Sequence, residues 1–121
     1  MDKNNAGHRG EERAADFLRR RGYTVEAMNF ACRGGEIDII ARRRGFLVFV
    51  EVKLRKNADF AEAREYVTAA KQQKILIAAQ TWMALHPTEL QPRFDVIEIY
   101  APNGVEGKLS FRHIEDAFQF D

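Results

Sequence analysis

The segment FVEVK at 49–53 has charged side chains at spacings that suit acid–base chemistry or the binding of a cation. Phe49, Glu51 and Lys53 alternate on one face of an extended strand, and valines occupy the other face. A strand that is apolar on both faces belongs inside a protein, where a carboxylate or an ammonium is costly unless it is paired or bound to a metal ion. Glu51 and Lys53 are therefore candidate functional residues, although a surface contact at a strand end would also explain the pattern.

Two further acids, Glu36 and Asp38, alternate with isoleucines in a preceding strand. The short segment 42–45 can close a hairpin onto the strand that carries Glu51, with Glu36 expected opposite Glu51. This register, or one shifted by two residues, gathers Glu36, Asp38, Glu51 and Lys53 on one face, whereas a slip of one residue would separate them. Three carboxylates so close repel one another unless a cation or a proton joins them.

Glu11 is a fourth acid, and its position relative to an apolar helix stripe draws attention to it. It precedes Ala14, Ala15 and Leu18 by three, four and seven residues, so it lies on the face of the helix that packs on the core. An acid in a first helical turn also compensates the helix dipole, which explains Glu11 taken alone. Together with the hairpin acids, a functional role becomes the better interpretation.

Such a group of carboxylates suits a hard cation. Carboxylate oxygens and water bind Mg²⁺ or Mn²⁺, which keep open positions for phosphate oxygens. An ion held in this way polarises a phosphodiester and lowers the pKa of an attacking water, and a nearby ammonium stabilises developing negative charge. We therefore expect Asp38, Glu51 and Glu36 to be metal ligands and Lys53 to assist the reaction.

The rest of the pattern predicts the elements that must position these residues. The expected elements are a helix at 8–21, strands at 23–30, 36–41 and 46–55, an irregular connection at 57–67, a helix at 68–85, a strand at 94–100, and a weak strand at 109–113 with a short helical tail. Their order is α-β-β-β-α-β with one extra strand, which indicates an α/β sandwich with a mixed sheet.

Composition narrows the class of protein. The chain has 121 residues, of which 45% are hydrophobic and 31% charged, as in an ordinary globular domain, and residues 1–121 are expected to form one domain. A single cysteine excludes a disulfide scaffold and a cysteine-based zinc cluster. No apolar run approaches the ~20 residues of a membrane span, and the N-terminal residues lack the apolar core of a secretory signal. We expect a cytoplasmic protein.

The net charge of +1 hides an asymmetry between the two halves of the chain. Residues 1–56 carry 13 Lys and Arg against 8 Asp and Glu, and the excess includes arginine triplets at 19–21 and 42–44. Such clusters suit phosphate backbones, but a solvated helix end and a solvated hairpin tip would look the same. The candidate nucleic-acid-binding residues are Arg42, Arg43, Arg44, Arg55, Lys56 and Lys71. Lys71 begins the inward stripe of the second helix, so it can reach the acids or a phosphate, or extend to solvent.

Four motifs stand in a fixed order along the chain: GxxGEE at 7–12, GGEIDII at 34–40, FVEVKLR at 49–55 and RFDVI at 93–97, together with Lys71. In combination they resemble the YraN-like family of small bacterial proteins, which is similar to Holliday junction resolvases of the PD-(D/E)XK nuclease superfamily. The resemblance covers nearly the whole chain. It implies a restriction-endonuclease-like fold with an αβββαβ core, a mixed central sheet flanked by helices. It also implies that Asp38 and Glu51 bind metal, that Lys53 is the catalytic lysine, and that Glu11 is the acid of the first helix.

These observations lead to one expected function and two alternatives. The first is a Mg²⁺- or Mn²⁺-dependent nuclease that hydrolyses phosphodiester bonds in DNA, in the manner of a resolvase. The second is a nucleic-acid-binding module that has the fold but no turnover of its own, and the third is an interaction domain whose acids are structural. DNA is the expected partner, no membrane is expected, and a homodimer stays open because resolvases of this fold commonly work as dimers.

Overall fold

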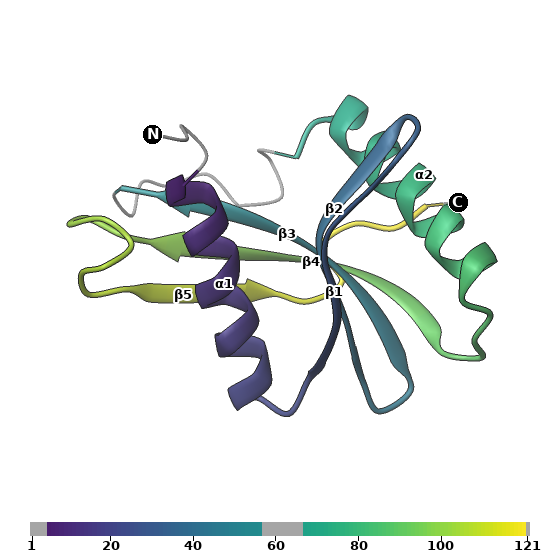
Figure 1. The fold of residues 1–121 in the computed structure, drawn as a ribbon, viewed down its shortest axis with the longest axis horizontal. Coiled ribbons are helices and arrows are strands. Elements are labelled where there is room, and N and C mark those ends of the chain that lie inside the picture. Colours follow the sequence, from purple (N-terminus) through teal and green to yellow (C-terminus); the bar gives the residue numbers. More distant parts are fainter. Residues whose placement is uncertain (1–4, 57–66, 121) are drawn as a thin grey trace.

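The computed structural model describes residues 5–56 and 67–120, which form two helices and five strands (Figure 1). The elements are α1 (Asn5–Arg20), β1 (Thr24–Cys32), β2 (Gly35–Arg43), β3 (Phe46–Arg55), α2 (Ala69–Leu85), β4 (Gln91–Tyr100) and β5 (Ser110–Ile114). This order confirms the expected αβββαβ core and its extra strand. The connection expected at 57–67 lies, except for its last residue, outside the described residues. In the described ranges, no helix is long and apolar enough to cross a membrane.

The strands form one mixed sheet in the order β1-β2-β3-β4-β5. β3 and β4 are parallel, and the other three neighbouring pairs are antiparallel. A parallel pair needs a long crossover connection, and α2 lies in the one between β3 and β4. The expected mixed central sheet flanked by helices is therefore confirmed.

Each helix buries its apolar stripe on a different part of the sheet, as Figure 1 shows for α1 across the sheet and α2 beside the β1–β2 hairpin. The α1 core contains Ala14, Ala15, Leu18, Tyr23, Ile39, Ala41, Val48, Val50, Ile97 and Ile99. The α2 core includes Ile37, Ile40, Leu47, Phe49, Ile75, Ala78, Ala79, Phe94 and Val96. Buried residues alternate between the two cores along β3, as expected for a central strand covered on both faces.

Both hairpin turns are tighter than the sequence suggested. β1 and β2 are separated by Arg33 and Gly34 alone, and β2 and β3 by Arg44 and Gly45. Arg44, the first residue of its turn, has a positive φ of 55°, as one of the favoured two-residue hairpin turns requires, and Gly34, the second residue of the other turn, has a φ of 82° that glycine adopts without strain. The gaps between the expected strands, 31–35 and 42–45, were each too long, because the strands continue into them.

The shorter second turn changes the register of the hairpin. Ile39 pairs with Val50, which is two residues away from the predicted alignment. The predicted register is therefore wrong, and Asp38, not Glu36, comes level with Glu51. The predicted face is kept, because a shift of two residues leaves every side chain on the same side of a strand.

The helical tail expected after the last strand is not formed in the described residues up to Phe120. The segment instead returns along β4, where the amide of Ala117 donates a hydrogen bond of 2.7 Å to the carbonyl of Phe94. The ring centroids of Phe118 and Phe120 lie 5.6 and 4.9 Å from that of Phe94. Aromatic packing on the sheet accounts for the extended course of this segment.

The sheet divides where β2 and β3 separate, and we call this place the fork. The pairing between β2 and β3 ends at Ile39 and Val50, whereas β2 stays paired with β1 and β3 with β4. Asn29 of β1 lies at the bend with a φ of 54°, and its neighbours Met28 and Phe30 pack in different cores. Figure 1 shows the β1–β2 hairpin leaving the plane of β3 and β4.

Candidate active site

Asp38 occupies the mouth of the fork. Because β2 has left β3 at this point, the amide of Val52 has no partner in the ladder, and an unpaired amide is costly. The carboxylate of Asp38 replaces the missing partner, since its Oδ2 accepts a 2.8 Å hydrogen bond from the Val52 N–H. The divergence of two strands thus fixes Asp38 beside the face of β3 that carries Glu51.

Glu51 is only 5% exposed, which is rare for a carboxylate. Its Oε2 lies 3.2 Å from the Nζ of Lys53, its neighbour on the same face of β3. Its Oε1 lies 3.9 Å from the Nζ of Lys71, which comes from the first turn of α2. The acid and the lysine that the sequence placed on one strand face are therefore in contact.

Glu11 reaches the same place from α1. The helix begins at Asn5, so Glu11 is not in the first turn and does not act as a dipole-compensating acid there. The neighbouring Gly10 is buried, and a Cβ added to it would lie 3.8 Å from Leu54 and 3.9 Å from Ile99. The small residue lets α1 lie close on the sheet, which brings Glu11 next to Asp38.

The three acids affect one another strongly. Burial, followed by the negative charge of Asp38, raises the pKa of Glu11 to about 7, although a hydrogen bond from Asn29 opposes the shift. Burial and the charge of Asp38 likewise raise the pKa of Glu51 to about 7, against the pull of Lys71 and Lys53. Near neutral pH the group must therefore hold protons or a cation.

The residues present fit a divalent cation with few protein ligands. Glu11 Oε1 and Glu51 Oε1 are buried and have no hydrogen-bond partner, so each is an acceptor that a cation would satisfy. No group of three or more His, Cys, Asp or Glu within residues 5–56 and 67–120 is arranged as a ready metal site. Mg²⁺ is commonly held by one or two carboxylates, and water and substrate phosphate complete its coordination shell. Asp38 and Glu51 are therefore enough protein ligands for this ion.

Glu36 does not join this group. Its carboxylate is 59% exposed and lies 2.8 Å from the Nζ of Lys71, which lowers the pKa of Glu36. Burial pulls the pKa of Lys71 down, but the hydrogen bond that it donates to Glu36 and the charge of Glu51 raise the pKa overall. The expected meeting of Glu36 with Asp38 and Glu51 is therefore not found, and Glu36 instead pairs with Lys71 beside those two acids. Lys71 reaches the acids and does not simply extend to solvent.

The other basic candidates lie in two places. Arg55 follows Lys53 on the same face of β3, half-buried, with its Nε 3.6 Å from Glu98 of β4, and Lys56 is exposed at the end of the described segment. The triplet at 42–44 lies at the opposite end of β2 from Glu36, at the turn into β3. The structure thus places Arg55 beside Glu98 on the Glu51 face of β3 and leaves the arginine triplet at the other end of the hairpin.

Two residues near the acids were not anticipated from the sequence. Asn29 of β1 lies opposite Asp38 of β2, and its side chain donates a hydrogen bond to Glu11. Glu98 is fully buried beside Lys53 on β4 and accepts a 2.5 Å hydrogen bond from the Tyr100 hydroxyl. Both are polar residues within apolar strands, and this was the signal available in the sequence. Asn29 marks a bend, because asparagine tolerates positive φ better than most residues. Glu98 marks a polar contact, because a buried carboxylate needs partners.

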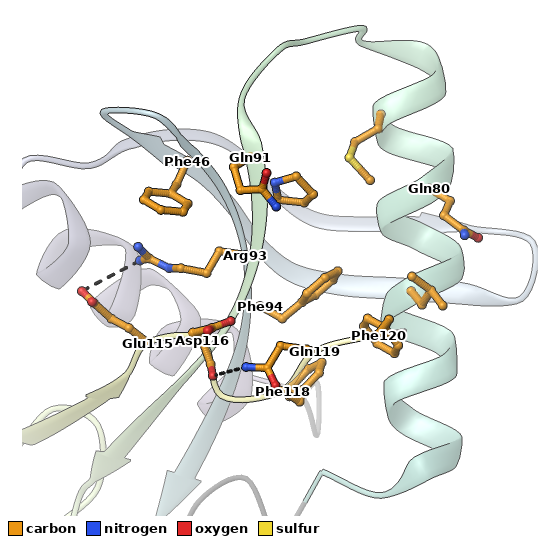
Figure 2. Close-up of a pocket in the computed structure, with 13 residues that line it drawn as sticks. Phe46, Gln80, Gln91, Arg93, Phe94, Glu115, Asp116, Phe118, Gln119 and Phe120 are labelled. Carbon is orange, nitrogen blue, oxygen red and sulfur yellow. Dashed lines mark hydrogen bonds and ion pairs between the residues drawn. The ribbon is translucent and has the colours of Figure 1, made fainter.

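An open groove lies elsewhere on the molecule, between β4, α2 and the returning C-terminal segment (Figure 2). This open groove has a volume of about 750 Å³ and its rings come from Phe46, Phe94, Phe118 and Phe120. Arg93 and Glu115 lie 3.9 Å apart at its edge. None of the residues proposed from the sequence as metal ligands or catalysts lines this groove. The candidate active site is therefore the fork, where those residues lie.

Comparison with other sequences agrees with the motifs. The profile of the uncharacterised protein family UPF0102 matches residues 10–99. A UPF0102 protein of Pelobacter propionicus is 46% identical over 98% of this chain and 85% of its own length. UPF0102 proteins of Symbiobacterium thermophilum and Caldanaerobacter subterraneus subsp. tengcongensis are each 44% identical, over 93% and 98% of this chain and 94% and 98% of their own lengths. The chain therefore belongs to the uncharacterised protein family UPF0102, which confirms the resemblance to the YraN-like family.

Proposed function

We propose that this protein is a divalent-metal-dependent nuclease that hydrolyses phosphodiester bonds in DNA. The observation that carries the proposal is the meeting of Glu11, Asp38 and Glu51 at the fork, beside Lys53, with two buried carboxyl oxygens lacking any hydrogen-bond partner. Structural acids in a core are normally satisfied by donors. Acids that are left unsatisfied beside a lysine are arranged for a ligand.

In this proposal Asp38 and Glu51 hold Mg²⁺ or Mn²⁺. When bound, the ion would polarise the phosphodiester and lower the pKa of a water molecule. Asp38 is held in place by the Val52 amide, so its orientation does not depend on the ion. The resemblance to resolvases supports DNA as the substrate, and that substrate places the activity in the cytoplasm.

The reaction is a hydrolysis in which a water oxygen attacks the phosphorus and the bond to the leaving alcohol oxygen breaks. The water loses one proton and the leaving oxygen gains one, so no oxidant or further reactant is needed. Lys53 Nζ, 3.2 Å from Glu51, is placed to orient the water and to stabilise negative charge on the phosphate. Glu11, with a pKa of about 7, is matched to exchange a proton near neutral pH.

The decisive experiment is cleavage of linear, nicked, flap and four-way-junction DNA with Mg²⁺ or Mn²⁺, alongside thermal melting with and without Mn²⁺. Wild type should cleave at least one substrate, and millimolar Mn²⁺ should raise its melting temperature because the ion binds only the folded state. Asp38→Ala should lose both effects, with cleavage reduced on the order of 100-fold or more. Lys53→Ala should keep the Mn²⁺ effect and lose cleavage.

Glu36→Gln is the matched control, since it removes an acid within the same segment that is paired with Lys71 and exposed. It should cleave within a few-fold of wild type. A wild-type protein that is insensitive to Mn²⁺ and cleaves none of these substrates would overturn the proposal. Salt-dependent DNA binding in that protein would then favour the binding module without turnover.

A further inference from the structure

The two arginine triplets, separate in sequence, meet at one end of the molecule. The Cζ of Arg43 lies 5.6 Å from the ring centroid of Tyr23, and a Cβ added to Gly22 would be 3.5 Å from the Nε of Arg43. The Cζ of Arg21 lies 4.6 Å from the ring of Phe17. The end of α1 and the turn between β2 and β3 therefore form one surface, the basic tip, which consists of residues 19–22 and 42–45.

The arginines of the basic tip differ in how they are paired. Arg19 lies 3.0 Å from Asp16, and Arg42 lies 2.8 Å from Glu26, so these two charges are partly neutralised. Within the described part of the chain, no carboxylate forms an ion pair with the remaining four: Arg20, Arg21, Arg43 and Arg44. A guanidinium stacked on a ring keeps its charge and its edge of N–H donors, so Arg21 and Arg43 are held in place yet free to bind phosphate.

The basic tip lies at a fixed distance from the acids of the fork. Arg21 directly follows α1 and is ten residues beyond Glu11, about 15 Å at the helical rise of 1.5 Å per residue. Five residues of β2 separate Asp38 from Arg43, about 16 Å at 3.3 Å per residue. Two independent elements thus give the same separation. A DNA duplex lying along the line from the tip to the fork rises 3.4 Å per base pair, so this separation corresponds to about four to five base pairs of such a duplex.

We infer that Arg21 and Arg43 of the basic tip bind the phosphate backbone of duplex DNA about four to five base pairs from the phosphate that reaches Asp38 and Glu51. The inference rests on the proposed function for the position of that second phosphate. A duplex is favoured because α1 and β2 set the spacing between the two protein sites, and a ligand that already holds its phosphates at a fixed spacing binds them without the ordering cost of a flexible strand.

The first test measures binding alone, by fluorescence anisotropy of a labelled 20-base-pair DNA duplex in EDTA over a series of salt concentrations. Arg21→Gln/Arg43→Gln should bind about tenfold more weakly at low salt. Its slope of log affinity against log salt should be shallower by about two, because two phosphate contacts are lost. Glutamine keeps part of the stem that packs on Phe17 and Tyr23, and equal melting temperatures verify the fold.

Arg19→Gln/Arg42→Gln is the matched control, because it removes the same net charge from arginines that already hold carboxylates. It should retain most of the wild-type slope. Equal losses in the two variants would show a general charge effect and overturn the inference, as would no loss in either. Equal or tighter binding of a 20-base-pair RNA duplex or of single-stranded DNA, with the same loss in the variant, would overturn duplex DNA as the ligand.

The second test concerns distance and uses cleavage. Wild type should exceed Arg21→Gln/Arg43→Gln in kcat/KM at positions deep in a duplex. The two proteins should be equal where the duplex ends within about four base pairs of the cleaved phosphate on the side that reaches the tip. A wild-type advantage that is independent of duplex length would overturn the spacing. If wild type cleaves nothing, the proposed function fails, while the binding test still decides whether the basic tip holds DNA.

Discussion

At the scale of single residues, the protonation of Glu11 and Glu51 controls what the fork can hold. Both are buried beside Asp38, and both have a pKa of about 7 instead of their ordinary 4.5. A cation that binds there competes with these protons, since it stabilises the same ionised carboxylates. Metal binding should therefore tighten as the pH rises through the neutral range.

The same shifts predict how stability depends on pH without metal. Between pH 4.5 and about 7 the folded protein keeps protons on Glu11 and Glu51 that the unfolded chain has already lost. The free energy of unfolding should therefore fall as the pH rises across this window and level off above it. Urea unfolding in EDTA at pH 5 and pH 8 measures the fall, to which Glu51 contributes on the order of 2 kcal/mol.

Glu51→Gln should remove its part of that fall, because glutamine is neutral at both pH values. Glu36→Gln is again the matched control, since the pKa of exposed Glu36 is lowered by Lys71, and it should keep the wild-type fall. A Glu51→Gln protein that loses as much stability between pH 5 and pH 8 as wild type would contradict the burial of a protonated carboxyl at this position.

At the scale of elements, the contact between α2 and the start of β2 determines where Lys71 lies. Gly35 is in contact with the helix backbone, and a Cβ added to it would lie 2.5 Å from the carbonyl oxygen of Lys74 and 2.7 Å from the amide of Ala78. Thr68 begins the helix by accepting a hydrogen bond from the Lys71 amide. The close approach and the cap together place Lys71 beside Glu36 and Glu51.

Gly35→Ala should therefore destabilise the protein by about 2–3 kcal/mol, because the added methyl group meets backbone atoms that cannot rotate away. Gly45→Ala is the control, as nothing lies within 4 Å of a Cβ at that turn. Urea unfolding checks both variants, and equal stabilities would show that α2 does not approach β2 as closely as described.

At the scale of the whole molecule, a buried polar network ties the end of the sheet to the C-terminal segment. Asp95 of β4 is fully buried and accepts hydrogen bonds from Arg93 at 2.8 and 2.9 Å and from the Asp116 amide at 2.9 Å. His113 of β5 lies 2.7 Å from the same carboxylate. Arg93 also donates to the Tyr23 hydroxyl at 2.7 Å. Burial opposes ionisation, but the bonds from His113 and Arg93 lower the pKa of Asp95 overall.

Asp95→Asn should lower the free energy of unfolding by about 3 kcal/mol, because it leaves the mostly buried guanidinium of Arg93 with only the exposed carboxylate of Glu115 as a charge partner. Asp16→Asn breaks the exposed pair with Arg19 and should cost at most about 1 kcal/mol. Urea unfolding of both variants provides the comparison. The Mn²⁺ affinity of folded Asp95→Asn should match that of wild type, since Asp95 faces the α1 side of β4 and is not among the acids at the fork.

The amino-acid sequence by itself determined which side chains share a face. Strict alternation predicted that Glu51 and Lys53 lie together on β3, and the apolar stripe of α1 predicted that Glu11 faces the sheet. Both predictions follow from the two- and 3.6-residue periods of strand and helix, which depend on local geometry alone. For the same reason the order of the elements and the bounds of β3 were predictable.

Only the tertiary structure decided which of these side chains contact one another. The register of β2, the fork at Ile39, the bend at Asn29 and the pairing of Glu36 with Lys71 all depend on contacts between segments far apart in sequence. Nothing in a local period distinguishes Glu36 from Asp38, because both lie on the same face of the strand. Asp38 alone lies where β2 leaves β3 and an amide needs an acceptor, so the packing of the whole sheet selects it.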